Sequence, residues 1–258
     1  MPLPRKRFGQ HFLCDQVIIA RIIQVLAPQP SDHLVEIGPG QGALTLPLIK
    51  QHFSLDAIEI DHDCIAELMA RTHHTPHLRI HAHDILSFDL ALLHKSPLRV
   101  FGNLPYNIST PLLFHLLKSA ALIHDMLFML QKEVGERLAA LPSTKAYGRL
   151  SVMMQYHCAI TLLFTVPAHA FYPPPKVESS IIHLQPYQTL PHVAENYALF
   201  ATIVREAFNQ RRKTLRNSLQ HFVSDTVWAA LPLSPKARAE ELSVADFVMI
   251  ANAIHRVN

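Results

Sequence analysis

The chain has 258 residues, of which 49% are hydrophobic and 17% charged; this is enough apolar material for a sizeable core and argues against disorder. We find neither a signal segment nor an apolar run of roughly 18 residues, so we expect a soluble, cytoplasmic protein. The net charge of +3 is mildly basic and excludes little by itself.

Apolar strand patterns and amphipathic helix patterns alternate along the first two thirds of the chain. The first helix pattern, at 15–27, begins at Asp15, whose side chain can cap a helix, and ends before Pro28. Strands are then predicted at 33–37, 55–61, 78–85, 97–102, 123–130, 161–166 and 177–184. Helices are predicted between them at 43–51, 62–72, 131–141 and 147–158. This alternation is typical of an α/β fold with a parallel sheet and helices on both faces.

The pattern changes in the segment 185–192, which Pro186 and Pro191 interrupt. Only helical signals follow it, at 195–208, 212–222 and 243–256. We therefore predict a boundary near residue 188, with an α/β domain at 1–188 and a small all-α domain at 189–258.

Cysteines and histidines give no sign of a structural metal or disulfide. The three cysteines are widely spaced and form no CxxC pair. The histidine pairs at 73–74 and 81–83 lack a Glu or Cys that would complete a familiar ligand set. No metal is expected.

Glycines are scarce but concentrated in one turn. Only 7 of the 258 residues are glycine, and Gly38, Gly40 and Gly42 lie within the five residues GPGQG. Glycine allows positive φ and a close approach of the backbone to a ligand. The turn joins a predicted strand to a predicted helix, which is where open α/β sheets bind ligands. No lysine follows as in a P-loop, and the motif alone also fits a tight turn without a ligand.

Two acidic residues lie at the ends of successive predicted strands. Glu59 lies 17 positions beyond Gly42, where a carboxylate can accept hydrogen bonds from both ribose hydroxyls. Asp84 lies near the end of the next strand and can accept from an adenine amine. Asp61 could contribute as well, or could cap the following helix. Together with the glycine turn, these acids predict a nucleoside pocket.

The sequence Asn103-Leu104-Pro105-Tyr106 follows the fourth predicted strand. An asparagine oxygen and a neighbouring backbone carbonyl can accept both N–H groups of an exocyclic amine. Pro105 stiffens the turn, and Tyr106 can stack on a base, an interaction worth roughly 1–3 kcal/mol. Alone, the four residues could be a loop with a buried tyrosine; beside a nucleoside pocket they predict a site for a target base.

Asn-Leu-Pro-Tyr after GPGQG resembles the adenine N6-methyltransferase signature (Asn/Asp/Ser)-x-Pro-(Tyr/Phe). Longer strings from about residue 5 to the C-terminus resemble the KsgA family of bacterial small-subunit rRNA adenine dimethyltransferases. These strings are RKRFGQHFL (5–13), VEIGPGQGALT (35–45), FGNLPYNIST (101–110), QKEVGERL (131–138), KAYGRLSV (145–152), PPPKVESS (173–180) and EAFNQRRKTLRNSL (206–219). The resemblance implies a class I, Rossmann-like methyltransferase that uses S-adenosylmethionine. Its expected reaction is dimethylation at N6 of two adjacent adenines in the 3′-terminal hairpin loop of 16S rRNA, within the assembling small subunit.

The resemblance also assigns residues. The cofactor-contacting positions are His11, Leu13, Gly38, Glu59, Asp84 and Asn103, to which the glycine turn adds Gly40 and Gly42. At residue 11 this chain reads FGQHFL where the family usually reads FGQNFL, so an imidazole replaces an amide. Phe171, before the proline run, resembles the family's second aromatic residue at the target pocket; ordinary core packing is the alternative.

Two basic clusters predict an RNA-binding footprint, although a solvated basic face is the alternative. They comprise Arg5, Lys6 and Arg7, and Arg211, Arg212, Lys213 and Arg216. On a continuous helix, Arg205, Asn209, Arg212 and Arg216 would line one face.

Two other functions fit parts of this pattern. The same chemistry on large-subunit rRNA or DNA is one, although DNA enzymes usually carry Asp-Pro-Pro-Tyr or Asn-Pro-Pro-Tyr and larger recognition domains. A ribosome assembly factor with incidental methylation is the other. No oligomer signal is found, and we expect a monomer.

Overall fold

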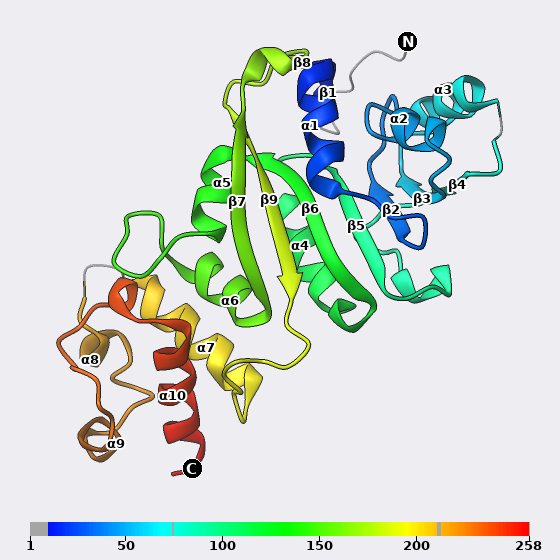
Figure 1. The fold of residues 1–258 in the computed structure, drawn as a ribbon. Coiled ribbons are helices and arrows are strands. Elements are labelled where there is room, and N and C mark those ends of the chain that lie inside the picture. Colours follow the sequence, from blue (N-terminus) through cyan, green and yellow to red (C-terminus); the bar gives the residue numbers. More distant parts are fainter. Residues whose placement is uncertain (1–9, 74, 211–212, 258) are drawn as a thin grey trace. The chain divides into compact units, whose positions relative to one another are not determined.

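The computed structural model describes residues 10–73, 75–210 and 213–257 (Figure 1). The chain divides into two compact units, Met1–Gly135 with Ile160–Pro186, and Glu136–Ala159 with Tyr187–Asn258. The chain passes from the first unit into the second for the last time after Pro186, which is close to the domain boundary that we expected near residue 188. However, Glu136–Ala159 belongs to the second unit, whereas we had placed it in the first. Helix α6 (Arg149–His157) explains the difference, because it packs on C-terminal helices.

Seven strands of the sheet occur where the sequence predicts strands, in the order β4-β3-β2-β5-β6-β9-β7. They are β2 (His33–Ile37), β3 (Leu55–Glu59), β4 (Leu78–Ala82), β5 (Leu98–Asn103), β6 (Ile123–Gln131), β7 (Cys158–Val166) and β9 (Ser179–Pro186). Strands β2 to β6 pair in parallel, and β9 pairs antiparallel with β6, so the predicted parallel sheet is mixed at one side. The strand order reverses between β2 and β5, and this reversal is where such sheets bind ligands.

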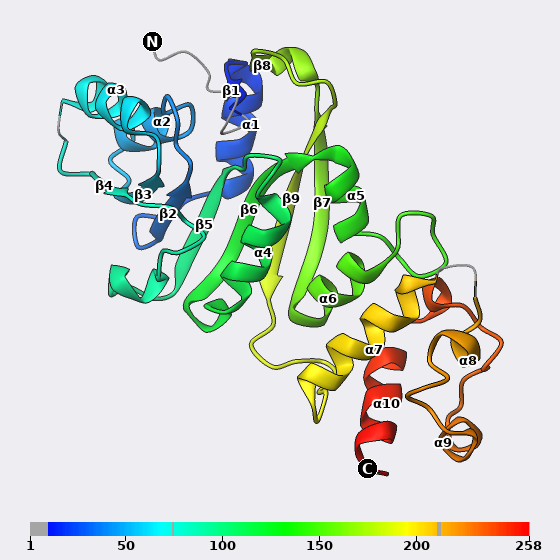
Figure 2. The ribbon, with the colours of Figure 1, turned by 180° about the vertical axis from the view of Figure 1, so that it is seen from behind.

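Helices cover both faces of the sheet, as predicted. They are α1 (Gln16–Leu26), α2 (Thr45–Lys50), α3 (His62–Thr72), α4 (Ser109–Leu117) and α5 (Lys132–Leu138). Helix α1 lies in front of the sheet in Figure 1 and α4 in front of it in Figure 2, which is the opposite view. Asp15 caps α1 by accepting from the amides of Val17 and Ile18, and Asp61 caps α3.

A second, two-stranded sheet was not predicted. Strand β1 (Phe12–Leu13) pairs antiparallel with β8 (Phe171–Tyr172), with Phe12 opposite Tyr172 and Leu13 opposite Phe171. The amide of Cys14 extends the pairing by donating to the carbonyl of Ala170, at 2.8 Å. Such a short pairing between distant segments has no periodic signal, but it brings the N-terminal segment to the ligand edge of the large sheet.

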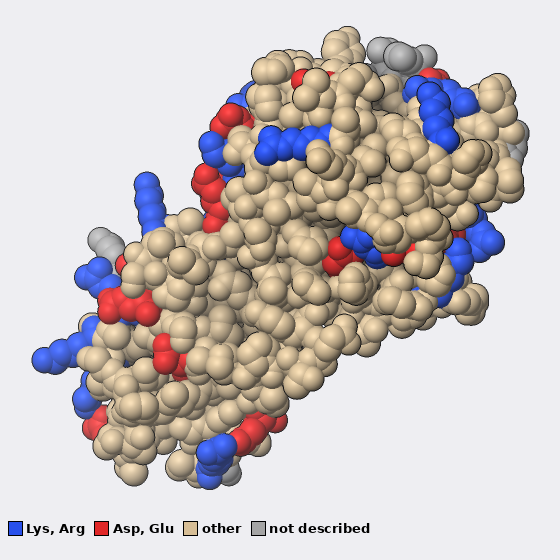
Figure 3. Space-filling model, viewed as in Figure 1, with Lys and Arg blue, Asp and Glu red and all other residues tan. Residues whose placement is uncertain are grey.

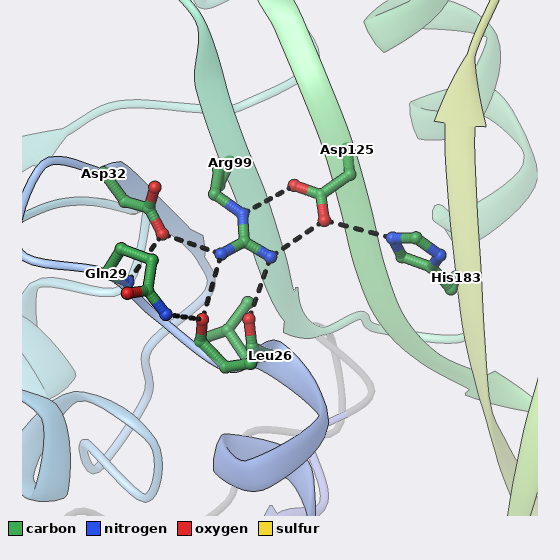
Figure 4. Close-up of polar contacts among 7 residues, drawn as sticks. Leu26, Gln29, Asp32, Arg99, Asp125 and His183 are labelled. Carbon is green, nitrogen blue, oxygen red and sulfur yellow. Dashed lines mark hydrogen bonds and ion pairs between the residues drawn. The ribbon is translucent and has the colours of Figure 1, made fainter.

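A buried ion-pair network links β5 to β6 near the amino ends of these two strands (Figure 4). Arg99 on β5 donates from Nε and Nη2 to both oxygens of Asp125 on β6, at 2.8 and 2.9 Å. Its Nη1 donates to Asp32 at 2.7 Å, and Nη2 also donates to the Leu26 carbonyl at the end of α1. Burial alone would raise the pKa of Asp125, but hydrogen bonds from His183 and Arg99 hold it far below its usual range.

Among its described residues, the regular elements of the second unit are helices, apart from the first residues of β7. Besides α6 it contains α7 (Tyr197–Asn209), α8 (Leu215–Ser218), α9 (Asp225–Ala230) and α10 (Val244–His255). The predicted helix at 212–222 is reduced to the four residues of α8, and α9 was not predicted. No helix in the described part of the chain is long and apolar enough to cross a membrane.

Candidate active site

A cavity of about 260 Å³ lies in the first unit, where the carboxyl ends of β2, β3 and β5 meet. Its lining includes most of the residues that the sequence predicted for cofactor and target base. The lining residues are Gln10, His11, Phe12, Leu13, Glu36, Gly38, Pro39, Gly40, Gln41, Ala43, Leu44, Glu59, Ile60, Asp84, Leu86, Asn103, Leu104, Pro105, Tyr106, Asn107 and Ile108. Gly42 and Phe171 are the two predicted residues that do not line it.

The three glycines of the turn all have positive φ, of +64°, +53° and +81°. At Gly40 an added Cβ would lie 3.1 Å from the ring of Phe12, so the backbone there passes directly under a cavity wall. At Gly42 it would lie 2.7 Å from Leu68 on α3. Gly42 therefore allows α3 to pack closely on the turn, whereas Gly38 and Gly40 line the cavity.

Gly102 allows β5 to approach β2 very closely. A Cβ there would lie 2.3 Å from the backbone carbonyl oxygen of Ile37, a contact that no side chain can make. Gly102 directly precedes Asn103, so this approach places the Asn-Leu-Pro-Tyr turn beside the glycine turn. The sequence showed the glycine but not the strand it meets.

Glu59, at the end of β3, is buried at the cavity wall and organises its surroundings. Its carboxylate accepts from the amide of Gly40 at 3.0 Å and from those of Ile60 and Asp61 at 2.9 Å. Burial raises the pKa of Glu59, while these three backbone hydrogen bonds lower it in part. A carboxylate offers about four acceptor positions, so it can still accept from a ligand hydroxyl.

Glu36 is a cavity residue that we did not predict. It is buried on β2, and its Oε2 accepts from the Thr45 hydroxyl at 2.6 Å. Burial raises the pKa of Glu36 to about 8; the Thr45 hydrogen bond opposes this rise and the charge of Glu59 adds to it. Glu36 therefore holds its proton more tightly than an exposed glutamate does. A charged residue inside the apolar strand HLVEI was the signal that could have identified it.

Asn103 is held in one orientation by the N-terminal segment. Its Nδ2 donates to the backbone carbonyl of His11, at 2.9 Å. The side-chain oxygen is consequently the end left to accept from an amine. The amide of Leu104 donates to the Met129 carbonyl at 3.1 Å, which anchors the turn to β6.

Tyr106 and His11 form one wall together. Their rings stack with centroids 5.7 Å apart, and the Tyr106 hydroxyl is 2.7 Å from that of Ser179. Burial raises the pKa of Tyr106, and the Ser179 contact opposes that rise. His11 Nδ1 donates to the Pro173 carbonyl at 2.7 Å, so its imidazole links β1 to the segment after β8. Direct cofactor contact by His11 remains a prediction.

Phe171 packs in the hydrophobic core and does not itself line the cavity. It is only 3% exposed and belongs to the hydrophobic core, together with Leu13 opposite it. The reason is the pairing of β1 with β8, which turns Phe171 inward and the next residue outward. Leu13, which lies opposite Phe171, lines the cavity, so a contact of Phe171 with the target base stays a prediction.

The predicted RNA-binding residues are partly outside the described residues, namely Arg5, Lys6, Arg7, Arg211 and Arg212. Arg205 pairs with Glu206 and Arg216 pairs with Asp225, while Lys213 is exposed. Figure 3 shows basic side chains interspersed with acidic ones on the face in view. Helix α7 ends at Asn209, so Arg205 and Arg216 do not share one helix face. In the first turn of α8, the amides of Leu215 and Arg216 donate to the carbonyls of Ala237 and Pro235.

The geometry fits a nucleoside cofactor next to an adenine amine. A glycine turn with positive φ at Gly38 and Gly40, an acceptor at Glu59 and an oriented acceptor at Asn103 share one cavity at the strand-order reversal. No group of three or more potential metal ligands occurs within 10–73, 75–210 and 213–257. Fold and site define a class I methyltransferase.

Comparison with known proteins specifies the family. The chain matches the family Ribosomal RNA adenine dimethylase over residues 3–256. It is 56% identical to Ribosomal RNA small subunit methyltransferase A of Chromohalobacter salexigens, covering 97% of this chain and 91% of the relative. The protein of that name from Pseudomonas savastanoi pv. phaseolicola is 51% identical, covering 97% and 94%. The chain belongs to the ribosomal RNA adenine dimethylase family, and it is an enzyme that uses S-adenosylmethionine.

Solved structures agree with the fold. A dimethyladenosine transferase from Plasmodium falciparum is similar with a TM-score of 0.76 and 25% identity, covering 93% of this chain and 96% of that one. The 23S rRNA methyltransferase ErmE is similar with a TM-score of 0.74 and 22% identity, covering 95% and 99%. The second likeness concerns the fold alone, so it does not favour large-subunit rRNA as the substrate.

Proposed function

We propose that this enzyme places two methyl groups on N6 of each of two adjacent adenines in the 3′-terminal hairpin loop of small-subunit rRNA, within the assembling subunit. The observation that carries the chemistry is the hydrogen bond from Asn103 Nδ2 to the His11 carbonyl, because it leaves the Asn103 oxygen as an acceptor. The choice of the small subunit rests on the names of relatives that are 51–56% identical over nearly the whole chain.

The residues of the site act by positioning. The Asn103 side-chain oxygen and the Leu104 carbonyl accept the N–H groups of the target amine, which favours a pyramidal nitrogen with an available lone pair. Tyr106 contacts the base that carries this amine. Glu59 and the backbone at Gly38 and Gly40 hold the cofactor. S-adenosylmethionine, when bound, supplies an electrophilic methyl group. Bases in RNA loops are suitable targets, because little stacking must be broken to extrude them.

A methyl-transfer assay tests this function. Small ribosomal subunits that lack the modification are incubated with the enzyme and labelled cofactor, and the digested RNA is analysed by mass spectrometry. We expect dimethyladenosine at two adjacent adenines of the 3′-terminal hairpin. Labelling of large-subunit RNA or DNA instead would retain the chemistry and refute the substrate. Cofactor binding without any transfer would favour an assembly factor.

We also propose that the second unit contributes to RNA binding through Lys213 and Arg216. Both are exposed, and a solvent-exposed ion pair such as Arg216–Asp225 is weak enough to exchange for a phosphate. The double change Lys213→Ala/Arg216→Ala should weaken RNA binding and flatten its dependence on salt. The slope of log K against log salt should fall by roughly 0.7–0.9 per lost phosphate contact.

Binding titrations between about 50 and 200 mM salt measure this slope. Lys50→Ala, which removes an exposed cation at the end of α2, is the control and should leave the slope unchanged. A double variant with the wild-type slope would exclude these two side chains from the RNA-binding surface.

A further inference from the structure

The β1–β8 pair presents one core face and one outer face. Leu13 and Phe171 lie opposite each other and are both buried in the hydrophobic core, and Leu13 also lines the cavity. Phe12 and Tyr172 also lie opposite each other, and directly opposed residues of an antiparallel pair point to the same side. Phe12 lines the cavity, with its ring against Gly40. Tyr172 must therefore stand beside Phe12 at the rim of the cavity.

Tyr172 is exposed, but its backbone is held firmly. The residue is 66% exposed, an unusual condition for a large aromatic residue next to a binding cavity. Strand β1 pairs with it on one side, and the carbonyl of the next residue, Pro173, accepts from His11 Nδ1. The His11 ring in turn stacks on Tyr106 of the target-base turn. A tyrosine on a fixed backbone has only two side-chain torsions, so it loses little conformational entropy when it stacks on a ligand.

We propose that Tyr172 is a stacking platform for an RNA base that flanks the target adenine. This assignment rests on the proposed function. An adenine that enters the cavity must leave its stack, and the neighbouring base then loses a partner. An exposed tyrosine at the rim replaces that partner without reading sequence, because every base has a π-face. Lys176, exposed in the same segment, adds a positive charge near the path of the RNA backbone.

This inference adds a contact with a flanking base to the contacts that the resemblance assigned at the target base. The resemblance assigned Phe171 to the target pocket; the structure buries Phe171, while Tyr172 reaches solvent. Tyr172 does not line the cavity, so it should act on the RNA and leave cofactor affinity unaffected.

Three variants separate stacking from other roles: Tyr172→Phe, Tyr172→Leu and Tyr172→Ala. For each, the KM for the RNA substrate, kcat, the cofactor Kd from calorimetry and the melting temperature are measured. We expect Leu and Ala to raise the KM for RNA roughly 5- to 100-fold. Phe should behave like the wild type, and cofactor Kd and melting temperature should not change. Tyr187→Ala, which removes another exposed tyrosine, is the control.

Other outcomes overturn the proposal. A wild-type KM in the Leu variant would show that apolar contact suffices and no base stacks there. A raised cofactor Kd would assign Tyr172 to the cofactor, and a lowered melting temperature would assign it to the fold. The assay uses whichever RNA the wild-type enzyme methylates, so a wrong choice of subunit would appear in the wild type, before any variant is compared.

Discussion

Replacing Asn103 with alanine should abolish measurable methyl transfer, with a loss in kcat of roughly a thousandfold. The reason is that the change removes an acceptor whose direction is already set by the bond from Nδ2 to the His11 carbonyl. A preorganised acceptor is worth more than its bond energy, because no reorganisation is needed when the amine binds. Cofactor binding should be weakened but measurable, because Glu59 and the glycine turn remain.

The comparison variant is Asn103→Asp, which keeps an acceptor but loses the donor to His11. It should retain more activity than alanine and less than the wild type, because a carboxylate next to the His11 carbonyl is repelled from the required position. Single-turnover rates and calorimetric cofactor affinities measure both effects. Near-normal turnover of the alanine variant, with intact folding, would refute the role of Asn103.

Replacing Arg99 with methionine should destabilise the protein by about 3–5 kcal/mol. The change removes the cation from between Asp32 and Asp125, both largely buried, and leaves the Asp125 carboxylate with only His183 as a partner among the contacts described above. It also releases the Leu26 carbonyl at the end of α1. The lost stability comes mainly from uncompensated buried charge, not from the ion pair itself.

Denaturant unfolding near neutral pH measures this loss. Arg216→Met is the matched control, because it removes the same side chain from an exposed ion pair and should cost at most about 1 kcal/mol. Equal effects of the two substitutions would contradict the importance of the buried network.

The pH dependence gives the same prediction a second test. In the wild type, the depressed pKa of Asp125 contributes stability that is complete above the unfolded pKa of about 3.9 and is lost as pH falls through the lower folded value. Without Arg99, burial raises the Asp125 pKa, so the carboxylate can be neutralised in mild acid. The stability difference between variant and wild type should therefore shrink below about pH 5.

The sequence by itself determined the architecture of the site. The glycine turn, Glu59, Asp84 and the Asn-Leu-Pro-Tyr turn each follow a strand, and the carboxyl ends of parallel strands meet at one edge of a sheet. Local patterns were therefore sufficient to predict both the strands and the cavity residues near them. The longer sequence strings that resemble the family were sufficient to predict the family, and the comparisons confirmed this prediction.

Only the tertiary structure decided details that depend on contacts between distant segments. The orientation of Asn103 depends on a carbonyl 92 positions earlier in the chain. The burial of Phe171 and the exposure of Tyr172 depend on which residue of β1 lies opposite each of them. Arg205 and Arg216 lie on separate helices, since α7 ends at Asn209 and the amides in the first turn of α8 donate to the distant carbonyls of Ala237 and Pro235. Hydrophobic periodicity reports which side of an element is buried, but not the partner that buries it.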